Sequence, residues 1–90
     1  MARLRQAGAV LVGITNVPEG GLWLETYNDV YGRTVNPWSV EHTAGGSSGG
    51  EGAIVATAGV AFGLGADVGG SIRIPAAFCG TVGHKPAPRA

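Results

Sequence analysis

The chain has 90 residues, which allows one small hydrophobic core and is too short for two. Hydrophobic residues make up 44% and charged residues only 13%, a composition that suits the interior of a larger protein and argues against a disordered one. The six basic and six acidic residues cancel without forming a basic stripe, which argues against a nucleic-acid partner.

The first elements predict an α/β sheet. Residues 1–6 are good helix formers, and Gly8 stands where such a helix would stop. Residues 9–15 are β-rich and almost continuously apolar, the pattern of a strand covered on both faces. The N-terminus has no apolar core like that of an export signal, so we expect a cytoplasmic protein.

Residues 16–43 are rich in Pro, Gly, Asn and aromatic side chains, which break any long period. We expect a long ordered loop with one short helix over residues 22–28. Loops of this length are uncommon unless they line a functional site. The scattered aromatic residues could line an acyl pocket, although packing within the loop is the default.

The second half of the chain is expected to alternate turns with buried elements. The expected elements are a glycine-rich turn at 45–50, a helix over 51–61, an interior strand over 60–67, a tight turn at 68–71, a helix over 72–78 and an extended segment over 81–90. The longest apolar run, residues 53–66, is shorter than the roughly 20 residues that span a bilayer, so no membrane segment is expected in this chain.

Simple interpretations of the sequence GGSSGG at residues 45–50 are weak. A phosphate-binding loop has glycines at this spacing, but Glu51 stands where a lysine must neutralise phosphate charge. A nucleophile elbow, as in α/β-hydrolases, would centre on Ser47, but it needs a preceding strand, and residues 36–44 do not resemble one. A tight loop without chemistry is the remaining alternative.

A second cluster, GADVGGSIRIP at residues 65–75, makes a loop without chemistry a poorer interpretation. Together with GGSSGG and the intervening small-residue helix, it resembles the amidase signature over residues 45–75 and fixes more than ten positions. The flanking segments GITNVPE, YGRTVNPW and GTVGHKP resemble bacterial amidases and type-two fatty-acid amide hydrolases. The resemblance implies that residues 1–90 are part of an amidase-signature domain, with a mixed central sheet covered by helices.

The resemblance also implies a mechanism. Ser71 would be the nucleophile that attacks an amide carbonyl, and Ser47 the bridging serine that relays its proton to a lysine. The peptide bond entering Ser47 is cis in relatives, and their catalytic lysine lies upstream of both serines, beyond Met1. Lys85 is therefore expected to be structural, and the isolated chain is expected to be inactive or nearly so.

Further positions of the signature are expected to support these two serines. The backbone N–H groups of the turn would form the oxyanion hole, supplied by Val68, Gly69, Gly70 and Ser71. Ser48 would hydrogen-bond within the site. Asp67 and Arg73 would hold the two turns together as a charge pair, the alternative being that Asp67 only ends a strand and Arg73 is solvated.

The resemblance implies a small-molecule amide substrate, with no metal and no organic cofactor. Cys79 is the only cysteine, so the chain has no internal disulfide, and the residue is most simply a buried small side chain. The rival interpretation is a non-catalytic truncated piece that only packs or assembles. Oligomeric state and amide specificity are not predicted.

Overall fold

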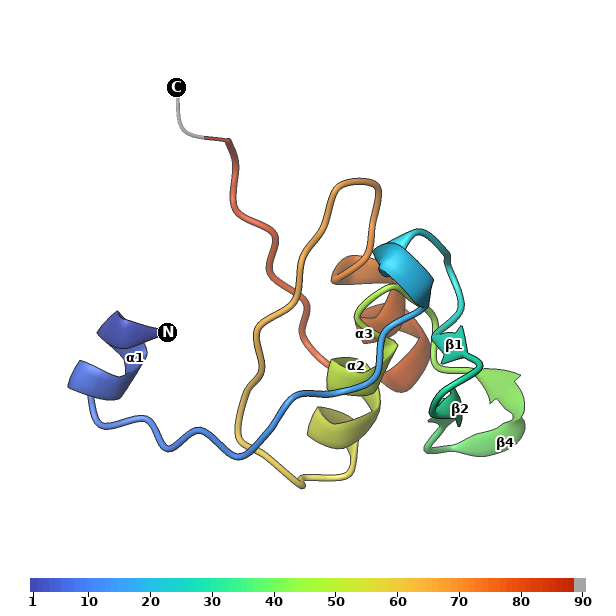
Figure 1. The fold of residues 1–90 in the computed structure, drawn as a ribbon, viewed down its shortest axis with the longest axis horizontal. Helices are drawn as coiled ribbons and strands as arrows, with labels where there is room; N and C mark the ends of the chain where they lie inside the picture. Colours follow the sequence, from blue (N-terminus) through green and yellow to red (C-terminus); the bar gives the residue numbers. More distant parts are fainter. Residues whose placement is uncertain (89–90) are drawn as a thin grey trace.

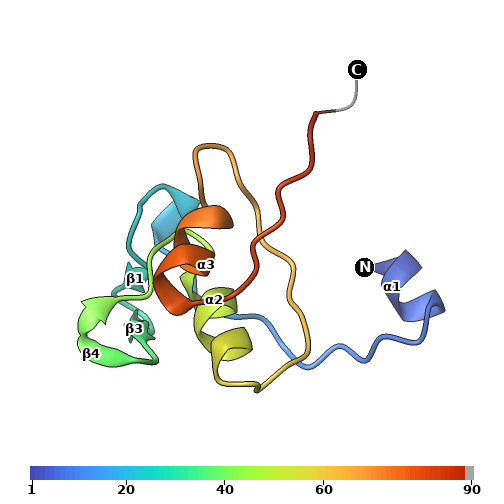
Figure 2. The same cartoon turned by 180° about the vertical axis from the view of Figure 1, so that it is seen from behind.

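The computed structural model describes residues 1–88, which form short helices and two small antiparallel sheets (Figures 1 and 2). The elements are α1 (Ala2–Gln6), the 3-10 helix η1 (Glu19–Gly21), β1 (Tyr27–Asn28), β2 (Gly32–Arg33), β3 (Val35–Asn36), β4 (Ser39–Thr43), α2 (Gly49–Ala56) and α3 (Arg73–Cys79). Strand β1 pairs with β2, and β3 pairs with β4. The chain is therefore mixed α and β. No helix among the described residues has the length and apolarity needed to cross a bilayer.

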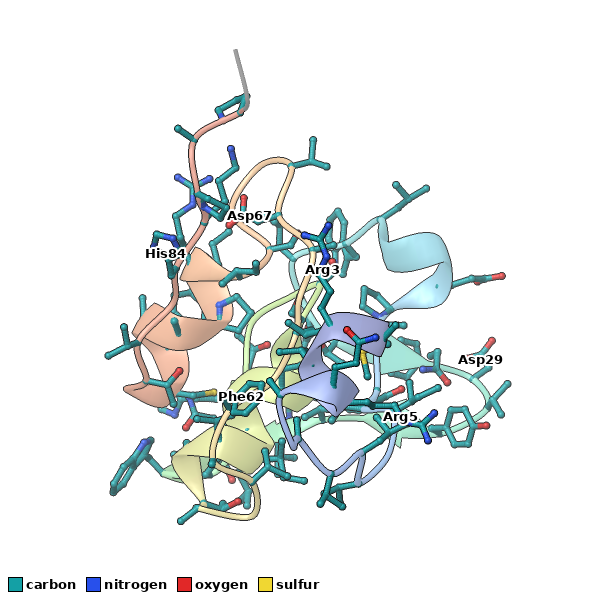
Figure 3. All side chains as sticks on the ribbon, turned by 90° about the vertical axis from the view of Figure 1, so that its left-hand side faces the viewer. Arg3, Arg5, Asp29, Phe62, Asp67 and His84 are labelled. Carbon is teal, nitrogen blue, oxygen red and sulfur yellow. The ribbon has the colours of Figure 1, made fainter. Side chains whose placement is uncertain are left out.

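Helix α1 stands apart from the other elements at the start of an extended segment (Figure 1). Gly8 has a φ of +95° and ends the helix, with its N–H bonded to the Arg5 carbonyl and the Ala9 N–H bonded to the Leu4 carbonyl. The predicted helix and its glycine stop are thus confirmed. The side chains of Arg3 and Arg5 project from α1 in the foreground of Figure 3.

The two interior strands predicted over residues 9–15 and 60–67 are not strands in this structure. Both segments follow open paths at the edge of the molecule (Figure 2). Val10 is 85% exposed and Ile14 is 98% exposed. A strand forms only when a neighbour pairs with its backbone, and within residues 1–88 no segment pairs with either one. The prediction is wrong for this reason.

The helix predicted over residues 22–28 is also absent, because this stretch pairs with a later segment. Strand β1 pairs with β2, and the Thr26 carbonyl accepts the Thr34 N–H at 2.9 Å. The Asn28 carboxamide oxygen accepts the N–H groups of Val30 and Tyr31, which builds the turn between these strands. Local strand pairing and turn chemistry therefore override helix propensity here.

Helix α2 begins two residues earlier and ends five residues earlier than the predicted helix over 51–61. Ala58 has a φ of +57°, and its N–H bonds to the Val55 carbonyl while the Gly59 N–H bonds to the Ile54 carbonyl. This bonding pattern is a Schellman cap, which stops a helix by satisfying its last carbonyl groups.

Helices α2 and α3 pack against each other and form the small core (Figures 1 and 2). Gly52 on α2 allows this approach, since a Cβ there would lie 2.9 Å from the Pro75 Cβ and 3.4 Å from the Cys79 Sγ. Ala44 and Ala76 complete a core made of small side chains. Helix α3 lies one residue after the predicted helix over 72–78, and it ends at Cys79 because the next residue, Gly80, has a φ of +75°. As predicted, the chain after α3 contains no regular element up to residue 88, and the last two residues of that prediction lie outside the described range.

Candidate active site

The first glycine turn connects β4 to α2 and is fully covered by protein. Residues 44–50 are all buried, and Ser47 and Ser48 are each 7% exposed. The Gly46–Ser47 peptide bond is cis, as the resemblance to the amidase signature implies. A Cβ on Gly46 would lie 2.8 Å from the Trp23 carbonyl oxygen, so glycine lets the preceding loop pack directly on this turn.

Thr26 is hydrogen-bonded to both ends of the first turn. Its side chain is fully buried, and its hydroxyl donates to the Gly45 carbonyl at 2.9 Å and accepts the Gly49 N–H at 3.0 Å. A side chain on Gly49 would collide with this hydroxyl. Thr26 was not singled out in the sequence, because no local pattern indicates a contact with a glycine 23 residues away.

The second turn, residues 67–73, is organised by the carboxylate of Asp67. Its Oδ1 accepts the Gly70 N–H at 2.8 Å, and its Oδ2 accepts the N–H groups of Ile72 at 3.1 Å and Arg73 at 3.2 Å. Three backbone donors converging on one side chain fix the path of the chain through Ser71 and into α3. Asp67 lies in the loop near the top of Figure 3.

Asp67 and Arg73 form a bidentate ion pair, with Nη2–Oδ1 at 2.9 Å and Nε–Oδ2 at 3.0 Å. The hydrogen bond from Arg73, helped by those from the backbone, holds the pKa of the Asp67 carboxyl well below its ordinary value. Both partners belong to the second turn. The expectation that this pair holds the two turns together is therefore wrong: it closes one turn on itself.

Ser48 makes the connection between the turns. Its backbone N–H donates to the Ser71 carbonyl at 3.1 Å. Its hydroxyl lies 3.4 Å from the Ala66 carbonyl, to which it donates, and accepts the Ala66 N–H at 3.3 Å. A Cβ on Gly65 would lie 2.7 Å from this hydroxyl, so glycine is required for the approach. The first turn, which contains Ser47, is thus hydrogen-bonded directly to Ser71 in the second turn.

The hydrogen bond from Ser48 to Ser71 places the backbone of Ser47 close to that of Ser71. Among residues 1–88, however, the structure has no hydrogen bond between the hydroxyls of Ser47 and Ser71. Ser71 is half-buried and follows Gly70, whose φ is +125°. In a site without substrate such contacts are often longer than in the reacting complex. Proton sharing between the two hydroxyls stays a prediction.

The four residues predicted to form the oxyanion hole are not equivalent. The Gly70 N–H is already bonded to Asp67. Within residues 1–88 the N–H groups of Val68, Gly69 and Ser71 are bonded to no other protein group. Val68 is fully exposed, and a Cβ on Gly69 would meet nothing within 4 Å, so this face of the turn is open.

One argument against a nucleophile elbow was wrong. Residues 36–44 do contain a strand, because the Asn36 carboxamide accepts the Trp38 N–H and turns the chain from β3 into β4. Strand, glycine turn and helix therefore follow in the order that an elbow requires. An elbow, however, exposes its serine at the tip of the turn, whereas Ser47 is buried beneath residues 21–26.

Other side chains with reactive groups lie away from the two turns or are shielded. Cys79 is fully buried and its thiol points at the Ala44 carbonyl, and burial raises the pKa of this thiol, which disfavours the thiolate nucleophile. The exposed His42 ring bonds to the Ser39 hydroxyl on β4. His84 is exposed and Lys85 is half-buried in the extended C-terminal segment. The described residues contain no cluster of His, Cys, Asp and Glu side chains suited to a metal.

A groove of about 350 Å³ runs beside the connection between the turns. Ser48, Glu51 and Ile72 line it, together with Phe62, which lies low in Figure 3. The Glu51 carboxylate accepts the Thr15 hydroxyl at 2.8 Å and so attaches the N-terminal extended segment to α2. Residues 61–63, 65 and 81–83 form the rest of its lining together with α2 and α3.

These two bonded glycine turns, one carrying a buried serine after a cis peptide and the other a half-buried serine, define a candidate serine-hydrolase site. A sequence model of the family described as Amidase matches residues 1–89, so the chain belongs to the amidase family. The resemblance to the amidase signature is thereby confirmed.

The chain is similar to named members of this family. It is 52% identical over 88 residues to fatty-acid amide hydrolase 2 of Homo sapiens, covering 98% of this chain and 16% of that protein. It is 49% identical over 87 residues to fatty-acid amide hydrolase 2-B of Danio rerio, covering 97% of this chain and 16% of that protein. It is 52% identical over 84 residues to a glutamyl-tRNA(Gln) amidotransferase subunit from Methanococcoides burtonii, covering 93% of this chain and 18% of that protein. The chain thus spans less than a fifth of the length of these relatives.

Proposed function

We propose that this segment supplies the nucleophile and the proton relay of a serine amidase that cleaves carboxamides. The Ser71 Oγ attacks the carbonyl carbon while its proton passes to Ser47, whose own proton passes to a lysine outside residues 1–90. The C–N bond then breaks as the relay returns a proton to the leaving nitrogen, and water hydrolyses the acyl ester on Ser71.

The hydrogen bond from the Ser48 N–H to the Ser71 carbonyl is the observation that carries this proposal. It fixes the spacing of two turns that are more than 20 residues apart in the chain. A serine hydroxyl is a weak nucleophile unless a partner accepts its proton, so a second serine on bonded backbone is a suitable relay. Burial of Ser47 shields this relay from competing water.

The oxyanion hole in this proposal consists of the backbone N–H groups of Val68, Gly69 and Ser71. Gly70 belongs to the same turn, but its N–H stabilises the Asp67 carboxylate and so contributes by shaping the turn. One donor aimed at the developing oxyanion is typically worth about 3 to 4 kcal/mol of the barrier. The open face above Gly69 leaves room for a substrate to approach these donors.

The substrate class in this proposal is a linear carboxamide. The relatives' names refer to fatty-acid amides and to a glutamyl-tRNA(Gln) amidotransferase, and the chain is equally similar to both. In the complete protein we propose that residues 9–15 and 60–67 pair with further strands of a mixed central sheet covered by helices. Their apolar sequences and their exposure here support that placement.

The test is amide hydrolysis by the full-length protein that carries this segment, with a long-chain primary amide and glutamine as substrates. Ser71→Ala is expected to lower kcat by about 10³-fold or more, because no other group can form the acyl ester. Ser47→Ala is expected to lower kcat to a similar extent with little change in KM, since the relay acts in the chemical step.

Ser39→Ala is the matched control, because this serine lies on β4 against His42 and away from both turns. It and Lys85→Ala should retain the rate of the unaltered protein. A Ser71→Ala variant that still hydrolyses amides would refute the mechanism. Full-length protein that folds but cleaves neither substrate would favour a non-catalytic packing or assembly role.

A further inference from the structure

Among residues 1–88 and outside the two glycine turns, Thr26 is the most deeply buried polar residue. It lies in residues 22–28, a stretch whose large apolar side chains at positions 22–24 are exposed, yet its own exposed fraction is zero. A hydroxyl in such a place must be fully hydrogen-bonded, since an unpaired buried polar group is destabilising. All three of its partners belong to the turn that carries Ser47.

The hydroxyl bridges the two ends of that turn. It donates to the Gly45 carbonyl at 2.9 Å and accepts the Gly49 N–H at 3.0 Å, with the Ser47 carbonyl at 3.5 Å as a second acceptor. Gly45 and Gly49 lie two residues before and two residues after Ser47. One oxygen atom thus sets the separation of the backbone on either side of the serine.

The bridge also completes helix α2. Ser48 is the N-cap residue of α2, but its side chain bonds to Ala66 and makes no capping hydrogen bond. The first backbone N–H of the helix, on Gly49, is therefore satisfied by Thr26 from another segment. This exchange frees the Ser48 hydroxyl to connect the two turns.

We propose that Thr26 is a positioning residue for the proton relay, an inference that rests on the proposed function of Ser47. By spanning Gly45 and Gly49 it fixes the backbone on either side of Ser47 and so the position of the Ser47 hydroxyl that the relay needs. A hydroxyl suits this position because it donates one hydrogen bond and accepts others through a single atom. Valine, which has the same shape, can do neither.

The backbone around the Thr26 bridge is closely packed, so the turn has no room to adopt another conformation. The chain at Leu24 and Glu25 lies against Gly46, where a Cβ would meet backbone atoms at 2.9 and 3.0 Å. The Thr26 carbonyl in turn accepts the Thr34 N–H at 2.9 Å, which connects the bridge to the β1–β2 pair. Movement at Thr26 is therefore transmitted directly to Ser47.

The experiment compares Thr26→Ser, Thr26→Cys and Thr26→Val in the full-length protein. Loss of the hydroxyl should lower kcat by about ten- to a hundredfold in Thr26→Val, because two buried backbone groups lose their partner and the relay shifts. KM should change by less than about threefold, since no substrate contact is removed. Thr26→Ser should restore kcat, and Thr26→Cys, with a weaker hydrogen-bonding group, should fall between.

A second measurement follows the reactivity of Ser71 itself. The rate of labelling by a fluorophosphonate ester, which phosphonylates an activated serine and releases fluoride, should fall in parallel with kcat. Thr57→Val is the matched control, because its exposed hydroxyl bonds to the Ile54 carbonyl at the end of α2 and lies away from both glycine turns. It should leave both rates unchanged.

The outcomes separate this inference from the proposed function. Unchanged turnover in Ser47→Ala would remove the relay and with it the reason for the proposal. Loss of turnover in Ser47→Ala together with full turnover in Thr26→Val would refute the role of Thr26 alone. If Thr26→Val does not fold, Thr26→Cys and Thr26→Ser decide: equal kcat in the two overturns the proposal.

Discussion

At the scale of single residues, Asp67 shows how one carboxylate can build a turn. Its side chain is completely covered, although Arg73, its ionic partner, is 56% exposed. Three backbone N–H groups and the guanidinium together use both oxygens. A charged acceptor makes stronger hydrogen bonds than a neutral one, so the path of residues 67–73 depends on the ionised form.

Asp67→Asn is therefore expected to lower the free energy of unfolding, by an amount that depends on pH. The folded-state pKa of Asp67 is depressed, so its stabilising contribution is fully present above about pH 4 and is lost as the pH falls below that value. Urea unfolding midpoints measured from pH 7 down to pH 2.5 should fall more steeply with acid in the unaltered protein than in Asp67→Asn. The variant should be the less stable of the two at pH 7.

Asp29→Asn provides the comparison, because Asp29 is exposed and accepts a hydrogen bond from the nearby Tyr27 hydroxyl, without any bond to a backbone N–H within residues 1–88. Its acid profile should follow that of the unaltered protein. Parallel profiles for Asp67→Asn and the unaltered protein would contradict the account of the turn.

Sequence patterns identified the residues of both turns but not all of their contacts. The signature placed Asp67, Arg73 and Ser48 at the site, and the structure bonds all three there. It did not indicate that Ser48, and not the ion pair, connects the turns. Thr26 escaped notice because its partners are distant in the chain and only the folded loop brings them together.

At the scale of elements, the contact between α2 and α3 sets the distance between the two turns. Each helix follows directly after one turn, and Gly52 faces Pro75 where the helices meet. Gly52→Ala should lower the free energy of unfolding by about 1 to 3 kcal/mol, because the new methyl group overpacks this contact. Urea denaturation of the full-length protein would measure the loss.

Gly69→Ala serves as the stability control for this change, since a Cβ there would meet no atom within 4 Å and the backbone φ is not positive. Its unfolding free energy should stay within about 0.5 kcal/mol of the original. Equal stability of the two variants would mean that the helices can separate without cost.

Elements with local stop signals were the predictable ones. Helix α3 lies close to its predicted limits because Gly80 ends it, and α1 ends at Gly8 as expected. Helix α2 was predicted too long, because Ala58 adopts a left-handed conformation that favours glycine and so carries no sequence signal. The paired strands were missed because each has only two to five residues.

At the scale of the whole molecule, the extended segments 9–15 and 60–67 leave large apolar side chains uncovered. Both are as apolar as interior strands, and in this chain neither has a backbone partner among residues 1–88. The mixed α and β content agrees with the class expected from the order of predicted helices and strands, whereas the two predicted interior strands do not form, because a strand needs a paired neighbour. The amidase relatives are five to six times longer than this chain.

Backbone hydrogen exchange tests whether these segments join a larger sheet. In the full-length protein, amides of residues 10–14 and 61–66 should exchange at least about a hundredfold more slowly than in the isolated 90-residue chain, because paired N–H groups are protected. Residues 50–55 of α2 should be protected in both. Equally fast exchange of the two segments in both proteins would contradict the sheet assignment.

The close approach of earlier residues to the glycines of the first turn has a consequence for protein engineering. Backbone atoms of Asn16 and of residues 23–25 lie where side chains on Gly50 and Gly46 would project. The stretch 45–75, although it contains every signature position, is therefore not a portable module. To transfer the two glycine turns to a new scaffold, a designer would have to include about thirty preceding residues as well, or replace the backbone contacts that these residues make with Gly46 and Gly50.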